Sequence, residues 1–249
     1  MERRTFLKCA GYAAGALAVL GTKTSAALDK PKGPFADISL KMSVPPGWFD
    51  GDIHQQLEQV AQWGFPAYEW LGPEGDMEAL KAKMDDLGLE LSCIVGAGSI
   101  APGHMVKKED HDNVVEQFEN RISLAKKLGC RRLIGLTGNE REDISYEEQM
   151  DNVVECLKRL APLAERNEVI LVVEALNPLV DHKGYFLTRT DQTIEILKRV
   201  GSPNVKMLFD IYHQQITEGN VIRNITNNIE YIGHFHVADN PGRKEPGTG

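Results

Sequence analysis

From residue 35 onward, short apolar runs alternate along the chain with longer stretches whose apolar residues recur every three to four positions. Short runs rich in Ile, Val and Leu are typical of buried strands, and a 3.6-residue period is typical of helices. The predicted strands are 38–44, 67–71, 91–96, 132–136, 170–175, 205–210 and 231–237. The predicted helices are 53–63, 77–87, 110–128, 146–166, 190–200 and 221–229.

This alternation of strand and helix predicts an α/β fold with a parallel sheet. The sheet could be an open, doubly wound one or an eightfold barrel. No glycine-rich phosphate loop follows the first predicted strand, and polar residues stand at the ends of several later strands. Both observations favour a (β/α)8 TIM barrel, which gathers its chemistry at the carboxyl ends of its strands. Because only seven strands are predicted, we expect a barrel that is truncated at its C-terminus.

The first 26 residues differ from the rest of the chain. Arg3 and Arg4 precede Phe-Leu-Lys, an apolar stretch over 9–21 and a small-residue segment at 24–27. The apolar stretch is too short for a membrane span of about 20 residues. The pattern predicts a twin-arginine signal peptide over 1–26, with a poorly ordered amphipathic tail as the alternative. We therefore expect an exported, periplasmic or extracytoplasmic protein that uses the twin-arginine export machinery, with a linker at 27–34 and the barrel domain at 35–249.

Composition and charge narrow the choice of partners. The chain is 42% hydrophobic and 26% charged, which is typical of a globular protein, and its net charge is −8. Without residues 1–26, 24 basic and 35 acidic residues remain, a net charge of −11 that disfavours nucleic-acid binding. The cysteines after residue 26 are scattered, so we expect buried thiols and neither a disulfide framework nor a zinc site. They are Cys93, Cys130 and Cys156.

Three consecutive predicted strands end in a side chain that can bind a metal, namely Glu174, Asp210 and His236. A carboxylate at the end of an apolar strand is costly to bury unless it is paired or binds a metal. Each residue also has an ordinary alternative role: a salt bridge for Glu174, a helix cap for Asp210 and a hydrogen-bonded core position for His236. Together they predict a site for Mn²⁺, Mg²⁺ or Co²⁺, because carboxylate oxygens and one imidazole suit these ions.

Other polar residues stand near these strand ends. His213 follows Asp210 by three positions, so it can face the same cavity, and alternation places His234 on the same strand face as His236. His182, in the loop after the strand of Glu174, could contact a substrate, and Arg243 could pair with a substrate carboxylate. A solvated loop and a surface arginine are the alternatives. Glu69 ends the second strand, where a ligand and a salt-bridge partner cannot be told apart from the sequence.

Five segments resemble hydroxypyruvate isomerase, a member of the xylose isomerase-like barrel superfamily that also holds ketose 3-epimerases and endonuclease IV. They are EALNP at 174–178, DHKGYFL at 181–187, KMLFDIYHQQ at 206–215, EGN at 218–220 and GHFHVADNPGRKEPGTG at 233–249. The resemblance covers about 35–249 and is densest over 170–249. The combination of DIYH with PGRKEPGTG is specific, whereas the barrel pattern alone is not.

The resemblance implies a divalent metal held by Glu174, Asp210 and His236, with substrate held by His213 and Arg243. Family members often carry Gln where this chain has His236, and a His there also resembles the epimerase branch. The fourth ligand of the family is a Glu directly after the PGTG segment. That Glu and the residue matching Glu174 form the acid/base pair, so we expect the chain as printed to be inactive.

The reaction implied is the conversion of hydroxypyruvate to tartronate semialdehyde through an enediolate, a step of glyoxylate metabolism. The alternatives are a ketose 3-epimerase or another sugar isomerase of the superfamily, and a non-catalytic exported sugar-binding module. The expected partner is a small hydroxy-keto acid or sugar, and an oligomer is possible. A DNA endonuclease is disfavoured by the negative charge. We expect ligand atoms of the three predicted metal residues to lie within about 5 Å of one another.

Overall fold

The computed structural model describes residues 41–101 and 104–249, which belong to one compact unit, Leu40–Gly249. The predicted signal peptide at 1–26 and the predicted linker at 27–34 lie outside the described residues. None of the helices in the described part of the chain is both long and apolar enough to cross a membrane.

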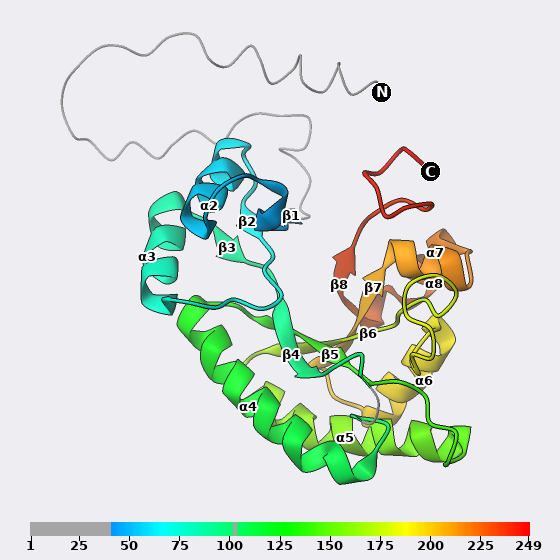
Figure 1. The fold of residues 1–249 in the computed structure, drawn as a ribbon. Coiled ribbons are helices and arrows are strands. Elements are labelled where there is room, and N and C mark those ends of the chain that lie inside the picture. The colour runs from blue at the N-terminus through cyan, green and yellow to red at the C-terminus, as the bar shows by residue number, and fades with distance from the viewer. Residues whose placement is uncertain (1–40, 102–103) are drawn as a thin grey trace, which may run out of the picture. The chain divides into compact units, whose positions relative to one another are not determined.

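The strands form two parallel sheets in which neighbours in space are neighbours in sequence (Figure 1). The first sheet contains the two-residue strands β1 (Ser43–Val44), β2 (Ala67–Tyr68) and β3 (Glu90–Leu91). The second contains β4 (Ile94–Gly98), β5 (Arg132–Leu136), β6 (Ile170–Glu174), β7 (Val205–Asp210) and β8 (Ile232–His236). This order, with helices between strands, is that of a (β/α) barrel.

Helices connect the strands. The α-helices are α2 (Ile53–Gln62), α3 (Met77–Leu87), α4 (His111–Leu128), α5 (Tyr146–Arg166), α6 (Thr190–Val200), α7 (Ile211–Thr217) and α8 (Val221–Asn228). Single 3₁₀ turns are η1 (Pro46–Trp48), η2 (Lys108–Asp110) and η3 (Ile229–Tyr231). Gly88, Gly129 and Gly201 end their helices with positive φ, a conformation that costs glycine little.

Most predicted elements are present, with three differences. The predicted third strand is divided at Ser92–Cys93 into β3 and β4, which belong to different sheets. Strand β2 is shorter than predicted, and Lys41 and Met42 lie outside β1. Helix α7 was not predicted at all, because seven residues are too few to display a helical period. Its start is instead set by Asp210, whose side chain accepts a hydrogen bond from the amide of His213.

The two sheets are not joined by pairing between β1 and β8 in the part of the chain that the structure describes. Strands β1 and β8 are therefore edge strands within the described residues. Strand β8 pairs with β7 from Met207 to Asp210, with one register shift, and all five of its residues are partly exposed. The buried thiols Cys93, Cys130 and Cys156 are free, as expected.

Candidate active site

The sheet β4–β8 has two faces with different side chains, and alternation along each strand decides which residues share a face. On one face, Ile134, Val172 and Leu208 form a small buried cluster with Cys93, separate from the main core under the helices. Glu174 stands two residues after Val172, and Asp210 stands two residues after Leu208. Both carboxylates therefore project on the same face as this apolar layer, one layer nearer the carboxyl ends of the strands.

The structure brings Glu174, Asp210 and His236 together. One potential ligand atom from each lies within 4.8 Å of the others. The Nδ1 atom of His236 is 3.2 Å from Oε1 of Glu174 and 3.6 Å from Oδ2 of Asp210. Both carboxylates are buried, and Asp210 is only 1% exposed. Two anions of this kind need positive partners, which in this structure are His236 and Arg243.

Asp210 caps a helix, the alternative role that its sequence position suggested, and it also pairs with Arg243. Its Oδ1 caps α7 by accepting from the amide of His213 at 3.1 Å, while its Oδ2 accepts from Nη2 of Arg243 at 2.7 Å. Burial raises the pKa of this carboxyl, but the hydrogen bond with His236 and the charges of His213 and Arg243 outweigh burial and hold the pKa well below its usual value. Asp210 is therefore ionised at neutral pH.

Glu69, whose role the sequence left open, contacts both histidines of β8. Its Oε1 lies 2.7 Å from Nε2 of His236, and its Oε2 lies 2.9 Å from Nε2 of His234. Burial raises the pKa of Glu69, but hydrogen bonds from the two histidines outweigh burial and lower it to about 2. Burial lowers the pKa of His236, yet hydrogen bonds with Asp210, Glu174 and Glu69 raise it well above its ordinary value.

His213 lies in the first turn of α7 and is 2% exposed. The side-chain oxygen of Asn177 accepts from two backbone amides, so its Nδ2 group must be the donor that lies 2.7 Å from Nδ1 of His213. The backbone amide of Asn177 points at the same nitrogen. Burial lowers the pKa of His213, so the ring is neutral with its proton on Nε2.

That tautomer places two hydrogen-bond donors face to face. The Nε2 atom of His213 lies 3.0 Å from Nη1 of Arg243, and both groups carry protons. The Arg243 side chain is 45% exposed and its guanidinium also lies over the ring of Tyr212. An oxygen of an anion could accept from both groups at once. Asn177 lies in the EALNP segment, but nothing in the sequence singled it out as a partner of His213.

The loop that carries Arg243 is organised by Asp239. The Asp239 carboxylate accepts from the backbone amides of Gly247, Thr248 and Gly249, and the backbones of Asp239 and Lys244 form a bridge. These backbone hydrogen bonds lower the pKa of Asp239. The carboxylate thus folds the PGRKEPGTG segment back on itself, which explains locally why Arg243 is presented towards α7.

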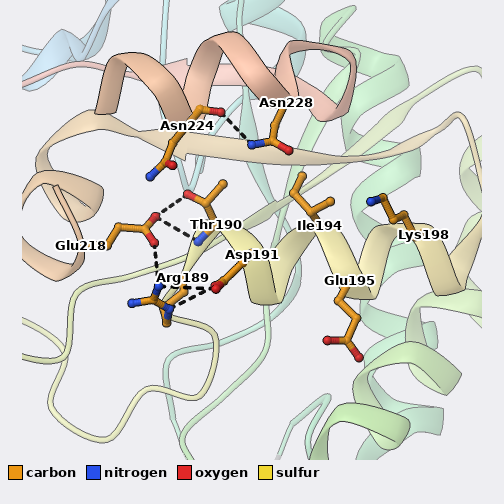
Figure 2. Close-up of a pocket in the computed structure, with 9 residues that line it drawn as sticks. All are labelled: Arg189, Thr190, Asp191, Ile194, Glu195, Lys198, Glu218, Asn224 and Asn228. Atoms are coloured by element: carbon orange, nitrogen blue, oxygen red, sulfur yellow. Dashed lines mark hydrogen bonds and ion pairs between the residues drawn. The ribbon is translucent and has the colours of Figure 1, made fainter. Parts of the chain in front are cut away.

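The remaining predicted substrate contact, His182, lies beside this cluster. The ring of His182 meets the ring of His213 edge to face, with 5.2 Å between centroids. A separate groove lies between α6 and α8 and shares no residue with the cluster (Figure 2). Several of its polar residues bond one another, Glu218 with Thr190 and Arg189 among them.

The cluster of Glu174, Asp210 and His236 has the donor chemistry of a divalent-cation site. It offers two carboxylate oxygens and one imidazole nitrogen, with no thiol, a set that suits Mn²⁺, Mg²⁺ or Co²⁺. A proton on His236 Nδ1 and the Arg243 guanidinium balance the carboxylates in this structure, and a cation could replace the proton. The second group that the described residues bring together is Glu69, His234 and His236, which shares His236 with the first.

A profile of the family described as xylose isomerase-like TIM barrel matches residues 57–249, so the chain belongs to that family. Among solved structures, the AP endonuclease of family 2 from Brucella melitensis superposes with a TM-score of 0.73 at 22% identity, covering 83% of this chain and 82% of that one. A D-psicose 3-epimerase from Clostridium cellulolyticum superposes with a TM-score of 0.65 at 22% identity, covering 78% and 72%. These likenesses concern the fold.

Sequence relatives narrow the class further. The hydroxypyruvate isomerase of Escherichia coli is 32% identical over 209 residues, which cover 80% of this chain and 78% of that protein. The 2-oxo-tetronate isomerase of Cupriavidus necator is 31% identical over 195 residues, which cover 75% and 73%. The protein is an isomerase of the hydroxypyruvate isomerase type, as the sequence motifs predicted.

Proposed function

We propose that the protein isomerises a small 2-keto acid with a neighbouring hydroxyl group, with hydroxypyruvate and tartronate semialdehyde as the reacting pair. One observation carries this proposal: the carboxylate cluster stands directly beside two facing donors, His213 Nε2 and Arg243 Nη1, 3.0 Å apart. A keto acid presents a carboxylate to such donors and a carbonyl to the cluster. Relatives named for hydroxypyruvate and for 2-oxo-tetronate support the same substrate class.

The residues of this chain have separate tasks in the proposed reaction. Glu174, Asp210 and His236 would hold a divalent cation, which when bound supplies Lewis-acid polarisation of the substrate carbonyl. Arg243 and the Nε2–H group of His213 bind the substrate carboxylate. His182, whose ring meets that of His213, borders the bound molecule.

Glu174 takes part in proton transfer. A carboxylate removes a proton from the hydroxymethyl carbon of hydroxypyruvate, and the electron pair forms the enediolate. A proton then returns to the former carbonyl carbon, while the hydroxyl proton moves to the former carbonyl oxygen. Substrate and product have the same atoms, so no external oxidant or reductant is needed. The buried position of Glu174 and Asp210 keeps bulk water away from this exchange.

A direct test compares substrates on the purified protein. The protein is stripped with EDTA, reloaded with Mn²⁺ or Mg²⁺, and followed by ¹³C NMR with hydroxypyruvate, 2-oxo-tetronate and D-psicose. We expect turnover of the keto acids and little of the ketose. The Arg243→Ala variant should raise KM for keto acids, and Lys244→Ala, the neighbouring cation, should not.

Two outcomes would contradict the proposal. Turnover of D-psicose without turnover of either keto acid would favour a ketose 3-epimerase, a candidate supported by the epimerase fold neighbours. Binding of all three compounds without turnover, unchanged by Glu174→Gln, would favour a sugar-binding module.

We further propose that residues 1–26 direct export of the folded protein. The support is the Arg3-Arg4 pair followed by a short apolar stretch. Replacing both arginines by lysine should keep the protein in the cytoplasm of a host that has the twin-arginine machinery, as cell fractionation would report.

A further inference from the structure

Glu69 occupies an unusual place in the site, because it follows a strand of the first sheet while its partners belong to the last strand of the second. It follows β2 directly, and its amide is held by the carbonyl of Val44 at 3.0 Å. Its side chain is 12% exposed. The hydroxyl of Ser92 donates to Oε2 at 3.2 Å. The contacts with Val44 and Ser92 therefore hold Glu69 in place in addition to its contacts with the histidines of β8.

The chemistry of this contact decides the tautomer of His236. An ionised carboxylate only accepts hydrogen bonds, so Nε2 of His236, 2.7 Å from Oε1 of Glu69, must carry a proton. The other ring nitrogen, Nδ1, faces Glu174 and Asp210 at 3.2 and 3.6 Å. In the neutral ring this nitrogen holds the free lone pair. It points at the two carboxylates that complete the candidate cation site.

We propose that Glu69 is a positioning residue of the cation site, which commits His236 to bind through Nδ1 by accepting the proton of Nε2. The inference rests on the cation site of the proposed function and extends it to a residue outside the ligand set. Ligating histidines in general depend on such an acceptor for orientation, and loss of the acceptor typically weakens metal binding by about 10- to 100-fold.

Besides its effect on the tautomer of His236, Glu69 also constrains the edge strand β8. In the described part of the chain β8 pairs only with β7, and it is partly exposed along its whole length. Glu69 binds His234 through its other oxygen, so one carboxylate holds two alternate residues of the strand. His234 thereby fixes the rotation of the Glu69 carboxylate, which keeps Oε1 aimed at His236.

The test uses isothermal titration of EDTA-stripped protein with Mn²⁺ and Mg²⁺. We expect Glu69→Ala to weaken the binding of either cation by about 10- to 100-fold. Glu69→Gln keeps an acceptor oxygen for His236 and should retain most of the affinity. Glu90→Ala is the matched control, because it removes an exposed carboxylate of β3 that pairs with Lys41. It should bind like the unchanged protein.

A second measurement reports the tautomer itself and does not depend on activity. Long-range ¹H–¹⁵N spectra of the Mg²⁺-loaded, histidine-labelled protein should show His236 protonated on Nε2, with the signal assigned from His236→Gln. Glu69→Gln should preserve that pattern. If Glu69→Ala fails to fold, as judged by thermal unfolding, the tautomer of His236 in the Glu69→Gln variant still tests the proposal.

The outcomes distinguish a failure of the proposed function from a failure of the proposed role of Glu69. Absence of cation binding by the unchanged protein would defeat the proposed function. Normal binding together with equal affinity of Glu69→Ala, or an Nδ1-protonated His236 in the loaded protein, would overturn the role of Glu69. Two bound cations per chain would overturn it too, because Glu69, His234 and His236 would then be ligands.

Discussion

The two sides of the candidate site are held in different ways. Glu174 and Asp210 end β6 and β7, strands that are paired on both sides and buried almost throughout. His236 ends β8, which pairs on one side within the described chain and is partly exposed. The backbone ladder and the apolar layer position the carboxylates. The histidine depends more on side-chain contacts, above all with Glu69, and this difference shows where the site is easiest to perturb.

The largest expected effect is on turnover, and it comes from changing Glu174 on the buried side of the site. Glu174→Gln keeps the shape of the side chain but removes the group that exchanges the proton. Turnover of the metal-loaded enzyme should fall by about 10² to 10⁴. Steady-state kinetics measures this loss, with Glu168→Gln, an exposed glutamate before β6, as the control. A loss below tenfold would assign proton transfer to another residue.

A pair of phenylalanines compares the two sides by stability. Phe209 of β7 is fully buried, and Phe235 of β8 is only partly buried, although their rings lie 6.2 Å apart. Phe209→Ala should lower the free energy of unfolding by about 3–5 kcal/mol. Phe235→Ala should lower it by a smaller amount, since it removes less buried surface. Urea unfolding measures both, and equal losses would show that β8 is packed as firmly as β7.

Cation binding should depend on pH through His236. Its pKa in the folded, metal-free protein lies well above the ordinary value, because hydrogen bonds with Asp210, Glu174 and Glu69 outweigh burial. The protonated ring therefore stabilises the metal-free fold below the unfolded pKa of about 6.5, and this contribution is lost as pH rises through the folded pKa.

A cation must displace the Nδ1 proton, so its affinity should rise by about tenfold per pH unit until the folded pKa is passed. Titration calorimetry in two buffers of different ionisation enthalpy counts the released proton. An affinity that does not change between pH 6 and 8 would contradict a proton-coupled site. The same experiment with His234→Gln should keep the pH dependence, because His234 is not in the predicted ligand set.

The smallest expected effect lies outside the cluster. Glu218 accepts from the amide of Thr190 at 3.1 Å and from its hydroxyl, and it pairs with Arg189 (Figure 2). It thus caps α6 from a distant position in the chain. Glu218→Ala should cost about 1 kcal/mol of stability, which is typical of a lost cap. Cation affinity should stay unchanged, and a parallel loss of affinity would mean that the groove and the cluster are coupled.

Much of the fold could be predicted because its signals are local. The periods of the long helices and the apolar strands β5, β6 and β7 are visible in the sequence, and their bounds agree closely with the structure. The convergence of Glu174 and Asp210 follows from the same logic, since parallel strands end side by side. Short elements carried no such signal: α7 was not predicted, and the third strand was not expected to divide between two sheets.

The sequence by itself determined which side chains reach the carboxyl ends of the strands, because alternation along a buried strand leaves each residue only two directions. The tertiary structure alone decided the partners that set their chemical state. Glu69 and His236 are 167 positions apart, and no local pattern links them. Asn177 sets the proton on His213 through a contact that exists only when two separate segments pack. A tautomer depends on what lies within hydrogen-bond distance, and that is a property of the folded chain.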